Sequence, residues 1–281
     1  MNFGPIVSSE WLDQHLHAEG QVVVDLRWSV ADGPKRADYE RGHIPGAVFA
    51  DLDVDLSGAA SDAAGRHPLP TPLHFGEAMS RLGIGDRTRV VVYDDAGGLV
   101  AARLWWMLDV LGREVAVLDG GIQAWSGKLS KAKPGPADAA FTPRPWPDRV
   151  RVSPDEVAAA LGGDLVLIDA RSAERYADGS EIDPRPGHIP GAQSVPAGSN
   201  LEDGYWRSPR ALRELYEAVD ADGDNVVAYC GSGVTACADL LGRRLAGLPD
   251  GRLYPGSWSQ WGADEDRPAS TGPMPLGPTP A

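Results

Sequence analysis

Two cysteines, Cys230 and Cys237, are the side chains of this chain best suited to nucleophilic chemistry. Two are too few for a disulfide framework, and their spacing is not that of a zinc site. Cys230 follows a short apolar run that ends in Tyr229, and it opens the glycine-containing segment CGSGVTA. A cysteine between a buried strand and a glycine-rich loop is a candidate nucleophile, because open parallel sheets bind ligands at the carboxyl ends of their strands.

The loop after Cys230 has the residues that can hold an anion. Gly231 and Gly233 let the backbone fold around the sulfur and turn successive N–H groups toward it. The next helix, predicted over residues 234–246, presents its positive N-terminal end to the same place. A lone cysteine after a strand is most often a small buried apolar side chain. With this loop beside it, we predict that Cys230 is functional.

The spacing around Cys230 bears on three neighbouring residues. A phosphatase loop needs an arginine six residues after its cysteine, and this position is Ala236, which disfavours dephosphorylation. Cys237 falls two helical turns after Cys230, so we expect buried packing rather than a redox partner. Thr235 stands at the start of the predicted helix and is expected to cap it and to shape the loop.

The elements that must position Cys230 occur twice along the chain. Four blocks recur in the same order at offsets of 136 to 145 residues: QVVVDLR and LVLIDAR at 21–27 and 165–171, GHIPGA at 42–47 and 187–192, VVVYDDAGG and VVAYCGSGV at 90–98 and 226–234, and DGGIQAW and PGSWSQW at 119–125 and 255–261. The chain is therefore a tandem duplication. The first copy has Asp94 where the second has Cys230, so only the second copy carries the nucleophile.

Each copy is predicted to be an α/β unit, a mainly parallel sheet with helices on both faces. Short runs rich in valine and isoleucine predict buried strands. These runs are residues 22–26, 90–93, 165–169 and 226–229. Helical patterns lie between them, with Ser8 or Ser9 as the first cap and Ser153 before Pro154 as another. These helices are predicted over residues 9–18, 99–111, 153–161 and 234–246.

The chain has 281 residues, which favours two domains. We expect an N-terminal, catalytically inactive domain at 1–127 and a C-terminal catalytic domain at 150–267. A proline-rich linker is predicted over 128–149. A disordered tail rich in proline and glycine is predicted over 268–281.

Composition excludes several partners. The 26 Lys and Arg against 40 Asp and Glu give a formal net charge of −14, which disfavours nucleic acid and anionic membrane surfaces. An anionic substrate then needs a local site made of arginines or backbone N–H groups. The N-terminal residues do not resemble a signal peptide, and the chain has no run of 18 apolar residues, so we expect a soluble cytoplasmic protein.

Taken together, these motifs resemble the two-domain rhodanese sulfurtransferases. The resemblance runs from Val22 to about Asp266 and rests on the tandem copies, GHIPGA in each, the acidic residue in the first copy, the loop CGSGVT and the closing GSWSQW. The loop is similar to that of the branch that uses 3-mercaptopyruvate, whereas thiosulfate sulfurtransferases carry a basic loop. Neutral Gly231 and Ser232 leave room for a bulkier keto acid that bears a thiol.

The resemblance implies how the donor is held. Arg175 and Arg185 stand where that branch binds the substrate carboxylate with two arginines, although one residue more than expected separates them. The loop residues expected to contact the donor are Gly231, Gly233, Val234 and Thr235.

The resemblance also implies an arrangement like that of a serine protease near the cysteine. Its members would be Ser232, His43 from the first HIPG motif and an upstream aspartate, for which Asp32 is preferred over Asp38. Structural roles are expected for three other residues of the second copy: His188, Trp258 and Trp261. Asp94 and Asp95 are expected to form an inactive loop with a structural role.

The expected reaction is sulfur transfer through a persulfide on Cys230, with pyruvate leaving as an enolate. A thiol, cyanide or a thioredoxin-like protein would then accept the sulfur, and the chemistry requires no metal or organic cofactor. One alternative is thiosulfate as the donor with the same cysteine. Another is a sulfur carrier or interaction module without turnover. The sequence leaves the oligomeric state open.

Overall fold

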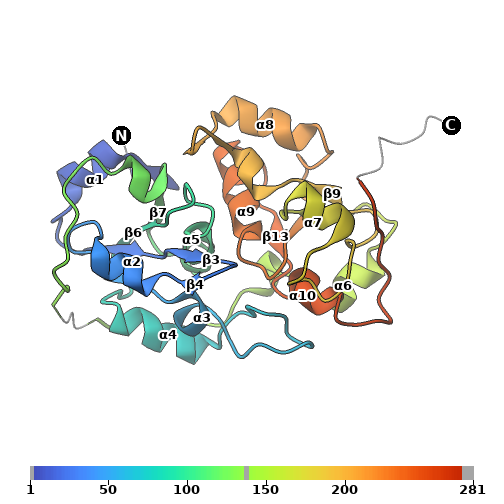
Figure 1. Ribbon diagram of the computed structural model, residues 1–281, viewed down its shortest axis with the longest axis horizontal. Helices are drawn as coiled ribbons and strands as arrows, with labels where there is room; N and C mark the ends of the chain where they lie inside the picture. The colour runs from blue at the N-terminus through green and yellow to red at the C-terminus, as the bar shows by residue number, and fades with distance from the viewer. Residues whose placement is uncertain (1–2, 136–138, 274–281) are drawn as a thin grey trace. The chain divides into compact units, whose positions relative to one another are not determined.

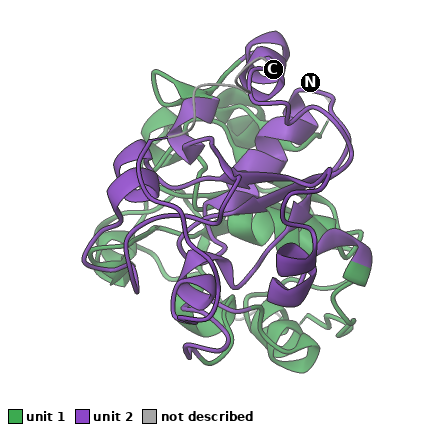
Figure 2. Ribbon diagram, turned by 90° about the vertical axis from the view of Figure 1, so that its right-hand side faces the viewer, with its two compact units in different colours: residues 1–59, 69–148, 201–207 green, residues 60–68, 149–200, 208–281 purple. Residues whose placement is uncertain are grey.

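The computed structural model describes residues 3–135 and 139–273 (Figure 1). Contacts divide the chain into two compact units (Figure 2). Unit 1 comprises residues 1–59, 69–148 and 201–207, and unit 2 comprises residues 60–68, 149–200 and 208–281. The division follows the duplication, except that one short segment of each copy belongs to the other unit.

Unit 1 is built on a five-stranded sheet in which every pair of neighbouring strands is parallel. Its strand order is β1 (Ile6–Val7), β7 (Val115–Leu118), β6 (Arg89–Tyr93), β2 (Gln21–Asp25) and β5 (Val48–Phe49). The helices are α1 (Ser9–His15), α2 (Arg36–Arg41), α3 (Leu52–Asp55), α4 (Pro72–Arg81), α5 (Ala102–Asp109) and the 3-10 helix η1 (Gly121–Ala124). Two hairpins complete the unit: β3 (Trp28–Ser29) with β4 (Gly33–Pro34), and β10 (Leu201–Glu202) with β11 (Tyr205–Trp206).

Unit 2 repeats this plan with four parallel strands. Its order is β13 (Arg252–Leu253), β12 (Val226–Tyr229), β8 (Val166–Asp169) and β9 (Gln193–Ser194). The helices are α6 (Pro154–Ala159), α7 (Ala173–Asp178), α8 (Pro209–Glu217), α9 (Ala236–Leu245), α10 (Ser257–Trp261) and the 3-10 helix η3 (Ala197–Asn200). The 3-10 helix η2 (Asp148–Val150) joins the units along the chain.

Alternation along the strands of unit 2 separates two faces of its sheet. Leu167, Val227 and Tyr229 lie in one core cluster with side chains of α6, α7 and α10. Their neighbours Ile168 and Ala228 are also fully buried, and α9 packs against β12. Helices therefore cover both faces, which confirms the predicted fold class.

The helix starts agree with the predicted caps in two of three cases. The Ser8 side chain accepts a hydrogen bond from the backbone N–H of Trp11, and Ser153 forms a full capping box with Glu156. The capping role expected of Thr235 is wrong, because this residue already has helical backbone angles and its side chain makes no cap hydrogen bond. A capping side chain needs an extended backbone to reach back to the first N–H groups.

The GHIPGA motif has the same structural role in both units. In unit 2, His188 is buried, its ring stacks on Tyr176 at 3.7 Å, and its Nδ1 lies 3.0 Å from the Tyr176 carbonyl oxygen. Burial lowers the pKa of His188 below its ordinary value. Arg171 clamps Asp169 with two guanidinium nitrogens and donates a hydrogen bond to the carbonyl of Gly187. The structural role predicted for His188 is thus confirmed.

The segments predicted as linker and tail are partly packed. Residues 128–135 and 139–148 belong to unit 1, where Trp146 donates its indole N–H to the Pro70 carbonyl and Phe141 contacts Phe75 edge-on. In the tail, the backbone of Ser270 pairs with that of His188. Residues 274–281 of the predicted tail lie outside the described residues.

Each copy contributes one segment to the other unit. Residues 60–68 follow β5 and α3 in the chain and precede α4, yet they belong to unit 2. Residues 201–207 follow β9 and η3 and precede α8, yet they belong to unit 1. We name residues 60–68 the arm.

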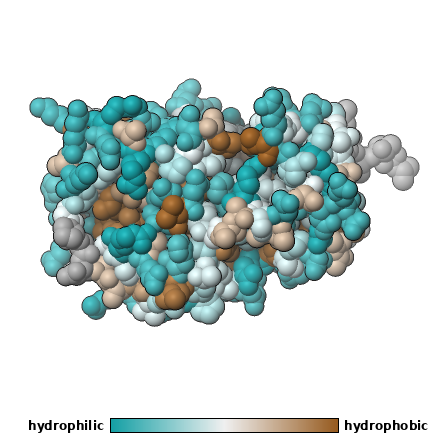
Figure 3. Space-filling view, turned by 60° about the horizontal axis from the view of Figure 1, so that its bottom comes forward, coloured by the Kyte–Doolittle hydropathy of each residue, from teal (hydrophilic) through white to brown (hydrophobic). Residues whose placement is uncertain are grey.

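The face shown in Figure 3 is mostly hydrophilic, and its apolar side chains form small separate groups. Within the described ranges, no helix has the length and apolar character that a membrane span requires.

Candidate active site

The site is built around the loop that follows β12. Cys230 is the first residue after the strand and is only 2% exposed. The backbone N–H of Gly233 points at its sulfur at 3.1 Å, and that of Ser232 does so at 3.5 Å. The predicted folding of the loop around the sulfur is confirmed. Both N–H groups can stabilise negative charge on this atom.

Position 233 requires glycine for two reasons, its backbone angle and a close backbone contact. Its φ is +78°, and a Cβ atom at this position would lie 2.5 Å from the carbonyl oxygen of Pro255. A side chain would therefore open the loop and turn the Gly233 N–H away from the sulfur.

The start of α10 holds the cysteine loop in place through two backbone hydrogen bonds. The backbone N–H groups of Trp258 and Ser259 donate to the carbonyl oxygens of Cys230 and Gly231 at 2.9 and 2.8 Å. These bonds hold the carbonyl groups of the loop while its N–H groups face the sulfur, and they explain why the GSWSQW segment accompanies the cysteine. Trp258 and Trp261 are fully buried, which confirms their predicted place in the core.

The histidine next to the loop comes from the arm. His67 Nδ1 lies 2.7 Å from Ser232 Oγ, within hydrogen-bond distance. The sequence had placed His43 there, and this assignment needs correction. His43 belongs to unit 1, is buried, and its Nδ1 and Nε2 lie 2.8 and 3.1 Å from the carbonyl oxygens of Tyr39 and Ala132. It has the structural role of its counterpart His188.

The two aspartates proposed as partners of His43, Asp32 and Asp38, lie in unit 1. Asp32 lies in the exposed turn between β3 and β4 of unit 1, where its carboxylate accepts a hydrogen bond from Ser29 at 2.9 Å. Asp38, the competitor, forms an ion pair with Arg41 on α2. Both aspartates belong to unit 1, whereas Ser232 and His67 belong to unit 2.

Arg175 lies at the loop, as the sequence predicted. Its Nη2 is 2.8 Å from the position that a Cβ of Gly231 would occupy. Its Nε lies 3.0 Å from a carboxylate oxygen of Asp183, and Nη2 contacts the other oxygen at 2.5 Å. Burial alone would raise the pKa of Asp183, but the hydrogen bonds and charge of Arg175, a hydrogen bond from Ser180 and the charge of Arg171 together hold this pKa below its ordinary value. Arg175 is thus oriented by a charged partner.

Arg185 is not brought to the loop. Its Nη2 donates to the carbonyl oxygens of Asp264 and Arg267 at 3.2 and 2.6 Å, and its guanidinium lies over the Trp258 ring at 5.8 Å. One residue more than expected separates Arg175 from Arg185, and the Arg185 side chain points to these two carbonyl groups instead of the loop.

A second guanidinium lies at the loop instead. Arg66, next to His67 on the arm, has its Nη2 2.9 Å from the same Cβ position of Gly231. Its backbone N–H donates to Ser259 Oγ at 3.0 Å, and its Nη1 donates to the Ile182 carbonyl. Burial, and then the charge of Arg175, lower the pKa of Arg66.

Sequence reasoning missed both Arg66 and His67. Their only signal is a basic pair in the segment SDAAGRHPLP of the first copy, and the segment at the corresponding place of the second copy, residues 201–207, carries no histidine. Nothing in the linear order places this segment beside Cys230.

The remaining predicted residues behave as follows. Cys237 is fully buried on α9, and its sulfur lies 3.5 Å from the Gly233 carbonyl oxygen, which confirms packing. Val234 is buried beside the loop and Thr235 begins the helix. Within the ranges that the structure describes, no group of three His, Cys, Asp or Glu side chains is arranged to hold a metal ion.

The equivalent loop of unit 1 is closed by its own side chain. The Asp94 carboxylate accepts hydrogen bonds from four backbone N–H groups at 2.7 to 2.8 Å, and Asp94 is fully buried. The donors are Ala96, Gly98, Val100 and Ala101. Burial raises the pKa of Asp94 while the four N–H groups lower it, with burial dominant. A carboxylate thus fills the place where unit 2 presents sulfur.

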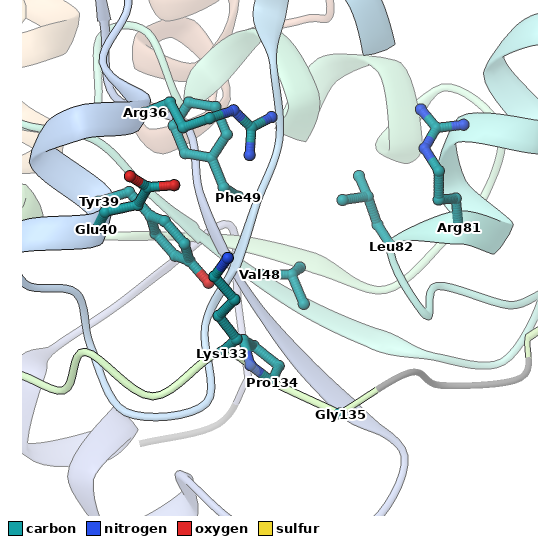
Figure 4. Close-up of a pocket in the computed structure, with 10 residues that line it drawn as sticks. All are labelled: Arg36, Tyr39, Glu40, Val48, Phe49, Arg81, Leu82, Lys133, Pro134 and Gly135. Carbon is teal, nitrogen blue, oxygen red and sulfur yellow. The ribbon is translucent and has the colours of Figure 1, made fainter.

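Unit 1 also contains a separate pocket of about 290 Å³ (Figure 4). Three cationic residues, Arg36, Arg81 and Lys133, line it together with Tyr39, Glu40, Val48, Phe49, Leu82, Pro134 and Gly135. It has no cysteine, serine or histidine in its lining, so it lacks the nucleophile that the Cys230 loop has.

Three comparisons agree with this geometry. The Rhodanese-like domain family matches residues 8–128 and 153–264. A probable 3-mercaptopyruvate sulfurtransferase of Pseudomonas aeruginosa is 39% identical over 284 residues, covering 97% of this chain and 100% of that protein. A putative thiosulfate sulfurtransferase, SseB of Mycobacterium tuberculosis, is 37% identical over 264 residues, covering 89% and 90%.

A solved structure shows the same architecture. The crystal structure of SseA from Escherichia coli, a 3-mercaptopyruvate sulfotransferase, superimposes with a TM-score of 0.81 at 31% identity, covering 90% of this chain and 98% of that one. With two matched Rhodanese-like domains, one of which carries a cysteine whose sulfur faces N–H groups of its own loop, this chain belongs to the rhodanese family.

Proposed function

We propose that this protein is a sulfurtransferase that takes the sulfane sulfur of 3-mercaptopyruvate onto Cys230 and passes it to an acceptor. The observation that carries the proposal is the position of the Cys230 sulfur, which faces two backbone N–H groups of its own loop beside the Arg175 guanidinium. The relatives named for 3-mercaptopyruvate support this choice of donor.

The first half-reaction forms the persulfide. The Cys230 thiolate attacks the donor sulfur, an S–S bond forms, and the C–S bond breaks with its electron pair passing to the carbon fragment. That fragment is the enolate of pyruvate, which takes up a proton. Ser232 is placed to donate a hydrogen bond to the enolate oxygen, and His67 is placed to orient the hydroxyl and exchange its proton. The loop N–H groups stabilise the anionic sulfur.

The second half-reaction returns Cys230 to its starting state. A nucleophilic acceptor attacks the outer sulfur, a new bond forms to that sulfur, and the Cys230 thiolate leaves. A thiol, cyanide or a thioredoxin-like protein has the required chemistry. The order of the steps predicts ping-pong kinetics.

Mass spectrometry of the protein after mixing with 3-mercaptopyruvate tests the proposal. We expect one added sulfur on the peptide that contains Cys230, and one pyruvate released per protein when no acceptor is present. Cys230→Ser should abolish both, lowering pyruvate release by at least about a hundredfold, because the nucleophile is lost. Cys237→Ala is the matched control, since that thiol is buried in packing.

Two results would contradict the assignment. Unchanged pyruvate release from Cys230→Ser would exclude this cysteine as the nucleophile. No release from the unmodified protein would favour a carrier without turnover.

A second candidate donor is thiosulfate. The named thiosulfate sulfurtransferase relative and the two guanidinium groups beside Gly231 favour an anionic donor of this kind. The ratio of kcat/KM for the two donors decides between them, and a tenfold preference for thiosulfate would replace 3-mercaptopyruvate in the proposal.

A further inference from the structure

We propose that the cavity of unit 1 drawn in Figure 4 is a second binding site of this protein, for a small organic anion that carries an apolar group. We call this cavity, with the ten lining residues of Figure 4, the unit 1 pocket. All of these residues belong to unit 1, whereas Cys230 and its loop belong to unit 2. The proposal therefore goes beyond sulfur transfer and does not depend on it.

Three elements and one extended segment form the walls of the unit 1 pocket. On α2, Arg36, Tyr39 and Glu40 are three and four residues apart, so one face of this helix contributes all three. The strand β5 contributes two apolar side chains and is the last strand in the order of the described sheet, so one of its edges pairs with no other described strand. The end of α4 and residues 133–135 complete the lining.

The base of the pocket is an ordered apolar surface. Tyr39, Phe49 and Leu82 are all buried, and the two aromatic rings meet at a tilt of 48° with their centroids 5.4 Å apart. The Tyr39 hydroxyl donates a hydrogen bond to the Ala47 carbonyl at 2.8 Å, which fixes this ring and satisfies its polar end. An apolar group would therefore gain contact with a fixed aromatic surface without breaking a hydrogen bond.

The charged side chains of the lining are exposed, which places them at the opening of the pocket. Three are cations, Arg36, Arg81 and Lys133, and one is the carboxylate of Glu40. Arg81 already forms an ion pair with Asp55. The Arg36 guanidinium instead lies over an aromatic ring of the lining, 4.6 Å from its centroid (Figure 4). Across the described ranges, neither Arg36 nor Lys133 has a carboxylate within 4 Å.

This surplus of positive charge selects an anion. Three cations and one carboxylate give the lining a net charge of 3 − 1 = +2, or +1 when the Asp55 partner of Arg81 is counted. The whole chain has a formal net charge of −14, so the pocket is a local exception to its surroundings. A bound carboxylate, sulfonate or phosphate group would supply the countercharge that Arg36 and Lys133 lack, through charge-assisted hydrogen bonds.

The volume of the pocket limits the size of the ligand. It measures about 290 Å³. This value is at the lower end of the range for small-molecule sites, roughly 300 to 1,000 Å³. One ring or two fused rings with an acidic group fit such a space. Because the lining has no cysteine, serine or histidine, we assign binding to the pocket and no reaction.

Isothermal titration calorimetry with 2-naphthoate tests the proposal, because this probe joins two fused rings to a carboxylate. We expect binding at one site. The neutral analogue 2-naphthalenemethanol should bind about tenfold more weakly, since it lacks the charge-assisted hydrogen bonds. Acetate, which has the charge without the rings, should also bind at least about tenfold more weakly. No binding of 2-naphthoate, or equal affinity for it and its neutral analogue, would overturn the proposal.

Substitutions at the opening locate the binding site. Arg36→Gln and Lys133→Gln should each raise the Kd of 2-naphthoate about tenfold, because each removes one charged contact. The Kd of 2-naphthalenemethanol should stay within twofold, which shows that the pocket is still folded. Arg41→Gln on α2 and Lys131→Gln in the neighbouring segment are the matched controls, since both side chains are exposed and outside the lining. Equal losses in the controls would reduce the effect to general electrostatics and contradict the proposal.

A further control separates the unit 1 pocket from the cysteine loop, which also has guanidinium groups beside it. Arg175→Gln should leave the Kd of 2-naphthoate within twofold, and Arg36→Gln should leave pyruvate release from 3-mercaptopyruvate unchanged. A loss of 2-naphthoate binding in Arg175→Gln but not in Arg36→Gln would assign the ligand to the cysteine loop and overturn the proposal. If the unmodified protein releases no pyruvate, the proposed function fails, and the calorimetry still decides on the pocket.

Discussion

At the residue scale, the chemistry depends on a few side chains whose partners are fixed by backbone groups. The Cys230 sulfur faces N–H groups of its own loop, and that loop is held by two N–H groups at the start of α10. Ser232 is 5% exposed and is hydrogen-bonded to His67. In unit 1 the Asp94 carboxylate accepts hydrogen bonds from the same kind of N–H groups, so a side chain of the loop itself occupies them.

The Ser232 and His67 pair predicts non-additive kinetics. If the two act as one proton-transferring unit, His67→Asn and Ser232→Ala should each slow pyruvate release about a hundredfold, and the double variant should be no slower than the worse single variant. Single-turnover pyruvate release checks this. Additive losses would mean that the hydrogen bond between them has no catalytic role.

At the element scale, the arm is the element that completes the site. It carries no helix or strand of its own, and its position depends on a turn at Gly65, whose φ is +86°. A Cβ atom there would lie 2.6 Å from the Gly256 carbonyl oxygen and 2.9 Å from Ser259 Oγ. The close approach of the arm to the start of α10 therefore requires glycine.

Gly65→Ala should displace the arm while leaving both units folded. We expect pyruvate release to fall about a hundredfold, as for loss of a general acid-base group, since His67 leaves the loop. Gly20→Ala is the matched control, because Gly20 has a φ of +73° with nothing within 4 Å of its Cβ position. Equal activity of the two variants would contradict the role given to the arm.

At the scale of the whole molecule, the duplication produced two equivalent loops, one with Asp94 and one with Cys230, and the exchanged segments give them different neighbours. Unit 2 receives Arg66 and His67 from the arm. Unit 1 receives residues 201–207, whose Tyr205 lies against Gly120 and whose Trp206 lies against Gly98. The Cys230 loop of unit 2 thus has an arginine and a histidine of the arm beside it. The Asp94 loop of unit 1 has two aromatic side chains against it.

This difference predicts that a cysteine alone cannot restore activity to unit 1. The double variant Asp94→Cys with Cys230→Ser should form no persulfide with 3-mercaptopyruvate and release no more pyruvate than Cys230→Ser, because the segment that unit 1 receives places Tyr205 and Trp206 against its loop, where the arm places Arg66 and His67 in unit 2. Mass spectrometry of the peptide containing position 94 checks this, with circular dichroism as the control for folding. One added sulfur on that peptide would contradict the prediction.

Most of the fold was predictable because its signals are local. The strand runs, such as residues 89–93 and 226–229, and the Ser153 cap depend on neighbouring residues, and the structure has them within a few positions of the predicted ranges. The cradle around Cys230 was predictable for the same reason, since its glycines and N–H groups lie within four residues of the sulfur.

The sequence by itself determined the duplication, the α/β units, the candidate nucleophile Cys230 and the loop that folds around its sulfur. Only the tertiary structure decided which distant residues reach that loop. His67, and not His43, lies within hydrogen-bond distance of Ser232. Arg66 lies at Gly231 beside Arg175. Arg185 instead donates a hydrogen bond to a backbone carbonyl of unit 2. The reason is that a segment of one copy packs in the other unit, and such packing depends on shape and hydrogen bonds between residues far apart in the chain, which no local pattern records.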